Sequence, residues 1–507
     1  LLEAEKDNID GVIIALPLHL HAPAAIAAMQ AGLHVLTEKL MGHSVHTCKE
    51  MARAADKYGK ILATGHQRHY NILYHEAMDT IQRGTLGDLH YIRAQWHRGN
   101  LPGRDSWQQP MPRKVKPKDP LARQLLETRK KYREQYASSI GAAMDEARLR
   151  VEQVEAQIRD EIVKAENFSY QANQITDGSG KVIYECPPIE ELIRWRLWDR
   201  TGGGLMAELG SHQLDAASIF VAAMHGGEKQ MPLSVAAAAD RPLFPSDRDV
   251  EDHVYCLLEF PTPGYKKEDP LAKNNTIGVQ YASINGNGFG GYGEMVFGTK
   301  GTLILDREQE AMLFLGGSET KVAVDQAAAV LDTQASGAAQ TAVAGAVREV
   351  SRGYREQLEH WAWCIKNPAP ENQPKCHPKV ALADAVIALV TNQSAREGRA
   401  IEFDQAWFDP DKDDTPFVGV GETSQSGEFR GGGGGSLVDD QRRTRARRIL
   451  RQRPTIGACP LVQQLGERVD DAVTDDKPTD GEAVPAPDPT NSLPGSDQEV
   501  GNRPSSE

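Results

Sequence analysis

The start of the chain contains a strand, a helix and a second strand in close succession. Residues 12–16 are continuously apolar and end at Pro17, which is typical of a strand buried on both faces of a parallel sheet. Residues 22–31 are rich in Ala, Ile and Met and stop at Gly32, a common signal for the end of a helix. Residues 34–37 then begin a second apolar strand. The pattern predicts part of an α/β domain with a parallel sheet.

A complete domain of this type opens with a strand and a glycine-rich turn that binds phosphate. Here Leu1 lies close before the first strand. We therefore predict that residues 1–88 are the C-terminal half of a doubly wound, Rossmann-type domain whose first half precedes Leu1. We therefore expect cofactor binding to be roughly a thousandfold weaker and the first strand to lie at an unprotected edge of the sheet. We also expect the chain, expressed as given, to aggregate and to be nearly inactive.

Composition limits the classes of function. The 507 residues are 40% hydrophobic and 25% charged, which suits a soluble protein with room for two domains. No apolar run reaches the roughly 18 residues that span a membrane. The formal net charge of −14 argues against a general nucleic-acid binder. The sequence therefore predicts a small-molecule partner, no nucleic-acid partner and no membrane partner.

The cysteines and histidines give little sign of cross-linking or metal binding. Six cysteines are scattered without a C-x-x-C pair, which favours reduced thiols and a cytoplasmic protein. Export stays open, because we expect the natural N-terminus to lie before Leu1. Short pairs that look like metal ligands lack a second pair at a zinc-like spacing, so the sequence predicts no metal site. These pairs are His43 with His46, His66 with His69, and Cys376 with His377.

Strand-like runs after residue 88 predict a second domain. Their composition and spacing indicate an α/β domain with a large, mostly antiparallel sheet over 89–109 and 186–410, with helices at 354–365 and 378–393. The runs lie at 91–97, 254–260, 276–284, 294–297 and 302–305.

Three stretches depart from this pattern. Residues 110–185 form a charged insertion, in which 123–164 predicts one or two long helices with many opposite charges. A solvated helical hairpin is the expected form, and a lid or partner-binding element is the alternative. Residues 320–348 are low in complexity and predict a helical or loose excursion. Residues 411–507 combine a glycine run, an arginine run and an acidic end, so we expect a disordered, solvated tail.

The first block resembles the Gfo/Idh/MocA family of NAD(P)-dependent oxidoreductases, whose pattern is Thr-Pro, a His, Gly-x-His-Val and Glu-Lys-Pro. Leu16 and Leu40 stand where the family has Thr and Pro. Later segments that resemble the family in the same order are 65–70, 84–89, 202–215 and 297–301. The matching positions of the first block are Pro17, His21, Gly32, His34, Val35, Glu38 and Lys39.

The resemblance implies a reaction and a set of catalytic residues. It implies hydride transfer between NAD or NADP and a hydroxyl carbon of a sugar, cyclitol or related polyol, in a homo-oligomer formed through the C-terminal sheet. Such chemistry needs a cation near the developing alkoxide and a base for the hydroxyl proton. We expect Lys39 to be the cation and His212 the base. Glu208 and Asp215, four and three residues away, would share a helix face with His212 and tune it.

Other residues are expected to line the cofactor and substrate sites. On the cofactor side these are Pro17, His21, Glu38, Lys39, Gln67 and Arg68, where a helix cap for His21 and a salt bridge for Arg68 are the alternatives. Trp198, Arg196 and Trp107 are candidates for the substrate pocket, because sugars stack on aromatic faces; burial of the tryptophans in the core is the equal alternative.

Two further interpretations of the function stay open. One is a redox-neutral, NAD-dependent cleavage or rearrangement of a glycoside on the same fold. The other is a non-catalytic binding or regulatory protein, which the expected loss of the phosphate turn and the residue Leu40 would favour. Residues 286–291 satisfy G-x-G-x-x-G, but a strand-like segment follows them, so we interpret them as a connection between strands.

Overall fold

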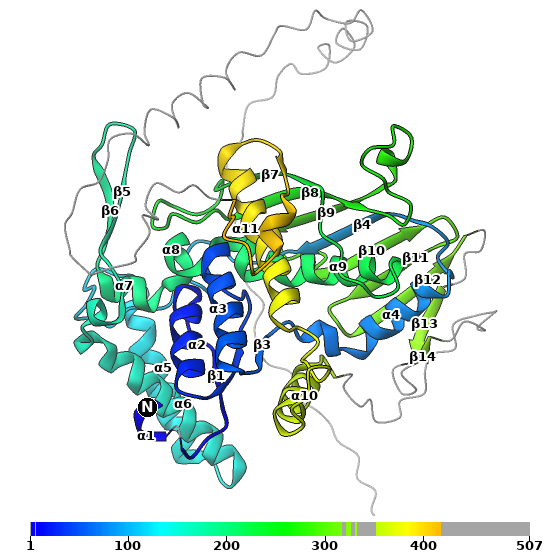
Figure 1. Ribbon diagram of the computed structural model, residues 1–507. Coiled ribbons are helices and arrows are strands. Elements are labelled where there is room, and N and C mark those ends of the chain that lie inside the picture. The colour runs from blue at the N-terminus through cyan, green and yellow to red at the C-terminus, as the bar shows by residue number, and fades with distance from the viewer. Residues whose placement is uncertain (1, 6, 317–320, 326–329, 332–350, 417–507) are drawn as a thin grey trace, which may run out of the picture. The chain divides into compact units, whose positions relative to one another are not determined.

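The computed structural model describes residues 2–5, 7–316, 321–325, 330–331 and 351–416 (Figure 1). The chain divides into two compact units, Leu1–Phe429 and Arg430–Glu507. All described residues belong to the first unit. Most of the predicted tail at 411–507 and part of the excursion at 320–348 lie outside the described residues.

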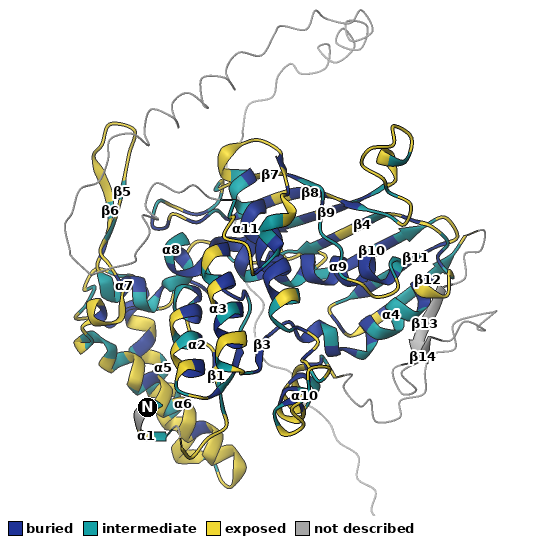
Figure 2. Ribbon diagram, viewed as in Figure 1, coloured by how far each residue is buried: buried dark blue, intermediate teal, exposed yellow. Residues whose placement is uncertain are grey.

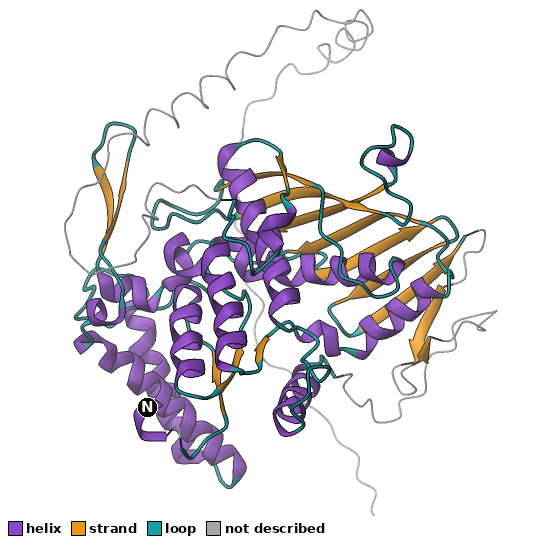
Figure 3. Cartoon of the chain, viewed as in Figure 1, coloured by secondary structure: helices purple, strands orange, loops and turns teal. Residues whose placement is uncertain are grey.

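The first part of the chain forms a three-stranded parallel sheet in the order β1-β2-β3 (Figure 3). Its strands are β1 (Gly11–Ile14), β2 (His34–Thr37) and β3 (Leu62–Thr64), and the linking helices are α2 (His21–Gln30) and α3 (Val45–Tyr58). Ser44 begins α3 with a capping box, and Gly59 ends it in the left-handed conformation at φ 61°. The predicted strand, helix and strand unit is confirmed.

The first strand is unprotected in the described chain, as expected, and it is not buried on both faces. β1 pairs only with β2 and is an edge strand, and Ile13 is 57% exposed. The central strand β2 and the other edge strand β3 are covered on both faces. Their second face packs against Trp361 and Cys364 of α10 (Tyr354–Lys366).

A ten-stranded sheet forms the second part, as the sequence predicted. All its neighbouring pairs are antiparallel except β4 with β9. The Gly-rich segment 286–291 connects β9 to β10, as expected. In spatial order the strands are β14 (Val330–Leu331), β13 (Lys321–Asp325), β12 (Glu310–Leu315), β11 (Gly301–Asp306), β10 (Tyr292–Gly298), β4 (Leu89–Trp96), β9 (Thr276–Ile284), β8 (His253–Pro261), β7 (Ser234–Asp240) and β15 (Ile401–Glu402).

Helices cover one face of this sheet. α9 (Ser211–Met224) packs on β4, β9 and β10 and against α4 (Ile72–Gln82). α11 (Pro378–Glu397) packs on β7 and also contacts α3 and β3. Every residue of α11 from Ala381 to Val390 is buried (Figure 2). This helix therefore belongs to the cores of both sheets.

The insertion contains a helical pair. α5 (Ala122–Ser138) and α6 (Ala142–Arg159) pack against each other, and Arg133 pairs with Glu155 across them. Most of their surface is exposed (Figure 2). The hairpin of β5 (Asn173–Thr176) and β6 (Val182–Cys186), which follows them, was not predicted.

The remaining elements are short. They include α1, α7 and α8, 3₁₀ turns and one π-helical turn, η6. Within the described residues, no helix is both long and apolar enough to cross a membrane. Their bounds are α1 (Leu2–Glu5), η1 (Leu18–Leu20), η2 (Gln67–Tyr70), η3 (Asp160–Ile162), η4 (Ala165–Phe168), α7 (Pro188–Ile193), η5 (Trp195–Leu197), α8 (Asp199–Gly202), η6 (Met206–Gly210), η7 (Ala272–Asn274) and η8 (Gln405–Phe408).

Some elements escaped the sequence analysis. β7 is mostly alanine and β12 follows a tight turn, so neither shows a strong strand pattern. Residues 321–325 and 330–331 are strands rather than helix or loose chain, because they extend the edge of the large sheet.

The buried Arg68 side chain joins the small sheet to the large one. Its Nε donates to Glu308 Oε1 at 2.7 Å, and its Nη1 donates to Glu294 Oε1 at 3.2 Å. Nη1 also donates to the main-chain oxygen of His212 at 2.5 Å. Burial opposes the guanidinium charge, yet Tyr74, Glu294 and Glu308 hold the pKa of Arg68 above its usual value. Arg68 therefore fixes the start of α9 relative to both sheets.

Replacing Arg68 by Met leaves the buried Glu294 carboxyl group without its cation. Removing one partner of a buried pair costs about 3–5 kcal/mol, so we expect Arg68→Met to lower the free energy of unfolding in urea by about that much. The control is Arg355→Met, which breaks an exposed pair with Glu359 and should change stability by less than ~0.5 kcal/mol. Equal losses in the two variants would contradict the role given to Arg68.

Candidate active site

A cavity of about 190 Å³ lies where the carboxyl ends of β1 and β2 face the segment from η5 to η6. Ligands of open α/β sheets bind at this end of the strands. Leu16, Leu18 and Leu40 give the cavity an apolar wall. Its polar lining comes from His21, Glu38, Lys39, Arg196 and Glu208.

Lys39 projects from the loop after β2 toward η6. Its Nζ donates to the main-chain oxygen of Glu208 at 2.5 Å and lies 3.7 Å from Glu208 Oε2. The Lys39 side chain is only 10% exposed. Burial lowers its pKa from the ordinary lysine value, and Glu208 opposes that change. The result is a desolvated ammonium donor at the edge of the cavity.

Glu208 is the electrostatic partner of Lys39. Burial disfavours its charge, but Lys39 and Arg196 together hold its pKa below the usual value. Arg196 Nε donates to Glu208 Oε1 at 3.0 Å. The Arg196 guanidinium also lies 4.1 Å from the centre of the Trp195 ring. Lys39, Glu208 and Arg196 thus form one charged group, in which a carboxylate bridges two cations.

Trp195 was missed by the sequence analysis. It lines the cavity, whereas Trp198 and Trp107 are buried in the hydrophobic core. Both of those tryptophans are therefore core residues, which was the alternative to a place in the substrate pocket. The adjacent pair Trp195-Arg196 is the signal that could have identified the correct ring, because cations commonly stack on tryptophan.

His21 lies at the inner end of the cavity. Its Nδ1 is 2.8 Å from the oxygen of Leu40, and its Nε2 is 2.8 Å from the oxygen of Leu16. Burial lowers its pKa, so the ring is neutral and donates one of these two bonds. His21 connects the loops after β1 and β2. Pro17, predicted beside it, is not among the residues that line the cavity.

His212 is in the first turn of α9 and does not line the cavity. Its ring lies 5.5 Å from that of Trp96 and 6.5 Å from that of His66, between centres. Its Nδ1 is buried without a hydrogen-bond partner in the described part of the chain. Burial, with the nearby charge of Lys39, holds the pKa of His212 well below its usual value. The imidazole is therefore neutral.

The expected helix face shared by Glu208, His212 and Asp215 is not formed. Glu208 belongs to the π-helical turn η6, where α-helical spacing does not apply, and it pairs with Lys39. Asp215 accepts a hydrogen bond from His69 Nε2 at 2.8 Å, and its charge raises the pKa of His212.

Two residues predicted for cofactor binding lie elsewhere. Arg68 forms salt bridges with Glu294 and Glu308, which was the alternative to cofactor binding. Gln67 is buried beside it in η2 and does not line the cavity. Glu38 does line the cavity, and its Oε2 accepts a hydrogen bond from the Lys39 main-chain nitrogen at 3.2 Å.

The residues present fit the nicotinamide end of a dinucleotide. An apolar wall accompanies a buried ammonium group, at the end of the sheet where such cofactors bind. The adenosine end has no counterpart that we can name, since no glycine-rich turn precedes a helix beside β1 to β3 in the described residues.

Residues 1–66 match the family model for Gfo/Idh/MocA, described as an oxidoreductase family with an NAD-binding Rossmann fold. Residues 1–66 are therefore similar to the Gfo/Idh/MocA family. The matched residues include β1 to β3 and Lys39.

Individual relatives match over short stretches. An uncharacterized oxidoreductase, YdgJ of Escherichia coli (strain K12), is 28% identical over 102 residues, which are 20% of this chain and 30% of the relative. The scyllo-inositol 2-dehydrogenase (NADP(+)) of Bacillus subtilis (strain 168) is 31% identical over 90 residues, 18% of this chain and 25% of the relative. The chain thus spans less than a third of the length of these curated relatives.

One solved structure supports the fold of the chain. An inositol dehydrogenase homolog from Azotobacter vinelandii, complexed with NAD⁺, has a TM-score of 0.50 and 14% sequence identity. The likeness covers 80% of this chain and 81% of the other. It therefore extends over both sheets, beyond the region matched in sequence.

Replacing Glu208 by Gln tests the electrostatics of the cavity. The carboxylate opposes the effect of burial on Lys39, so Glu208→Gln should lower the pKa of Lys39 further. The measurement is the rate of Lys39 acetylation by trace acetic anhydride against pH, followed by peptide mass spectrometry. We expect its midpoint to move to lower pH, while Glu310→Gln, at an exposed position, leaves it unchanged. An unchanged or higher midpoint in Glu208→Gln would contradict the pairing.

Proposed function

We propose that the protein is an NAD(P)-dependent oxidoreductase that moves a hydride between the cofactor and a hydroxyl carbon of a sugar, cyclitol or related polyol. The observation that carries this proposal is the desolvated Lys39 ammonium group at the carboxyl end of β2, inside a cavity. Similarity to the Gfo/Idh/MocA family supports it, since residues 1–66 match an NAD-binding Rossmann model.

Bound NAD(P) supplies the carbon that accepts or returns the hydride. Lys39 directs its ammonium group at the substrate oxygen and stabilises the negative charge that develops there. His212 is neutral, so it accepts the hydroxyl proton in the oxidation and returns it in the reduction. Its place outside the cavity lining requires the substrate to reach from the cavity toward Trp96, or a water molecule to pass the proton.

The two carboxylates have different roles in this proposal. Glu208 holds Lys39 in place and raises the pKa of its ammonium group against the effect of burial. Asp215 acts on His212 through its charge alone, which raises the pKa of that ring and partly offsets burial. NAD or NADP is the cofactor proposed for this site, in agreement with the family match of residues 1–66.

A polyol is the substrate class that the lining favours. Trp195 offers a ring face on which a sugar or cyclitol can stack. Arg196 and Glu208 supply a donor and an acceptor for neighbouring hydroxyl groups. The B. subtilis relative is a dehydrogenase of scyllo-inositol, which is consistent with this class.

We also propose a homo-oligomer formed through the large sheet, in the cytoplasm. On β8, Tyr255 and Leu257 are exposed on the face that the helices do not cover. Exposed apolar residues on a sheet face often mark a protein interface.

Free thiols support the proposed cytoplasmic location. The cysteines of the described residues are all free and buried, namely Cys48, Cys186, Cys256, Cys364 and Cys376.

The catalytic assignment is tested with the product of the complete reading frame, a panel of polyols, and reduced cofactor followed by absorbance. Lys39→Met and His212→Asn should each lower kcat by about 10²–10⁴, the usual contribution of one acid–base group. The dissociation constant for the cofactor should change by less than about threefold, since neither side chain holds the phosphates. Lys57→Met, at an exposed position on α3, is the matched control and should keep full activity.

Two outcomes would overturn the proposal. Unchanged turnover in both variants would indicate that the cavity is not the site of chemistry. Product formation without accumulation of reduced cofactor would indicate the redox-neutral reaction on a glycoside instead.

A further inference from the structure

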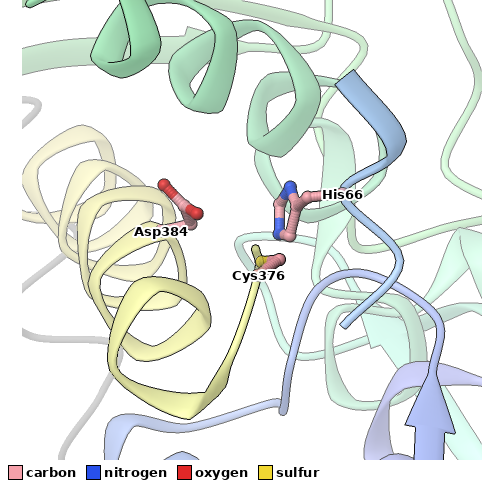
Figure 4. A group of neighbouring side chains, drawn as sticks. All are labelled: His66, Cys376 and Asp384. Atoms are coloured by element: carbon pink, nitrogen blue, oxygen red, sulfur yellow. The ribbon is translucent and has the colours of Figure 1, made fainter. Parts of the chain in front are cut away.

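A second cluster of reactive side chains lies outside the cavity. His66 follows β3, Cys376 precedes α11, and Asp384 is on α11. The three side chains point toward one another (Figure 4). One possible ligand atom from each residue lies within 4.8 Å of the other two, and all three residues are buried.

Two polar atoms of this cluster have no hydrogen-bond partner in the described residues. They are Nε2 of His66 and Oδ2 of Asp384. A buried polar atom left without a partner costs about 1–3 kcal/mol. Native proteins therefore keep very few such atoms, and a bound ion is one common way to satisfy them.

We propose that His66, Cys376 and Asp384 bind a divalent transition metal, with Zn²⁺ the best match. Imidazole, thiolate and carboxylate are the three ligand types that zinc takes from proteins, and its tetrahedral shell is completed by a water or a fourth group. One thiolate and one carboxylate balance two positive charges, so the buried site is neutral. The thiolate disfavours Mg²⁺ and Ca²⁺, which prefer oxygen ligands.

Asp215 would orient the histidine ligand. Its Oδ2 lies 3.4 Å from Nδ1 of His66, which leaves Nε2 of that ring for the metal. A carboxylate on the far nitrogen of a metal-binding histidine fixes the ring and increases its basicity. Asp215 is on α9, so the site connects α9, α11 and the loop after β3.

Lys229 would compete with the metal for the Asp384 carboxylate. Its Nζ donates to Asp384 Oδ1 and to Ser218 Oγ, and lies 3.8 Å from Asp215 Oδ1. The other oxygen of Asp384, Oδ2, is the one without a partner. The ammonium group repels a nearby dication, and therefore sets the metal affinity without supplying a ligand.

The test uses the tag-free product of the complete reading frame, stripped with a chelator and then titrated with Zn²⁺ or Co²⁺. After desalting, elemental analysis should find one Zn²⁺ per chain. The Co²⁺ form should show a thiolate-to-cobalt absorption band in the near ultraviolet. Cys376→Ser should lose the band and weaken Zn²⁺ binding at least tenfold, whereas Cys256→Ser, which removes a buried thiol of β8, should keep both.

Lys229→Met separates metal binding from a general loss of structure. Removing the competing ammonium group should tighten Zn²⁺ binding at least tenfold, and added Zn²⁺ should raise the melting temperature of this variant more than that of the natural protein. A misfolded variant cannot show this gain. No cobalt band in the natural protein, a band that survives in Cys376→Ser, or weaker binding in Lys229→Met would each overturn the proposal.

Discussion

The burial of Arg68 is the constraint on which the arrangement of the two sheets depends. Its guanidinium group reaches Glu294 on β10, Glu308 after β11 and the main-chain oxygen of His212 at the start of α9. A buried cation tolerates little displacement, because each lost partner leaves a charge in a medium of low dielectric constant. The loop after β3, the large sheet and the helix that carries His212 are thus fixed to one another by one side chain.

The cavity follows from that arrangement. The end of β2 presents Lys39, and η6, just before α9, presents the Glu208 oxygens that receive it. The two elements form the site together, because Lys39 donates to the main-chain oxygen of Glu208 and adds its charge to that of Arg196 beside the buried carboxylate. α11 adds a second connection, since it packs on β3 and on β7, and the proposed metal site lies at its N-terminal end.

Local patterns predicted most of the elements, whereas long-range contacts decided the site. The range of β2 was predicted from a short apolar run, and that of β9 from its strand-like composition. Lys39 was singled out because it comes just after a strand. The partner of Asp215 could not be predicted, because His69 is far from it in sequence and helix periodicity favoured His212. The π-helical turn displaced Glu208 from the expected face, and Trp195 rather than Trp198 reached the cavity. His66 and Cys376 are likewise far apart in the sequence, so the two residues showed no zinc-like spacing.

The central claim is that hydride moves between a polyol carbon and a nicotinamide held beside Lys39. The most direct measurement uses cyclitols deuterated at their carbinol carbons, incubated with the product of the complete reading frame and NAD⁺ or NADP⁺. Nuclear magnetic resonance then locates the label. The account predicts deuterium at C4 of the reduced nicotinamide ring, lost in Lys39→Met. Oxidised product with deuterium released to water, or no label on the ring with any polyol, would contradict it.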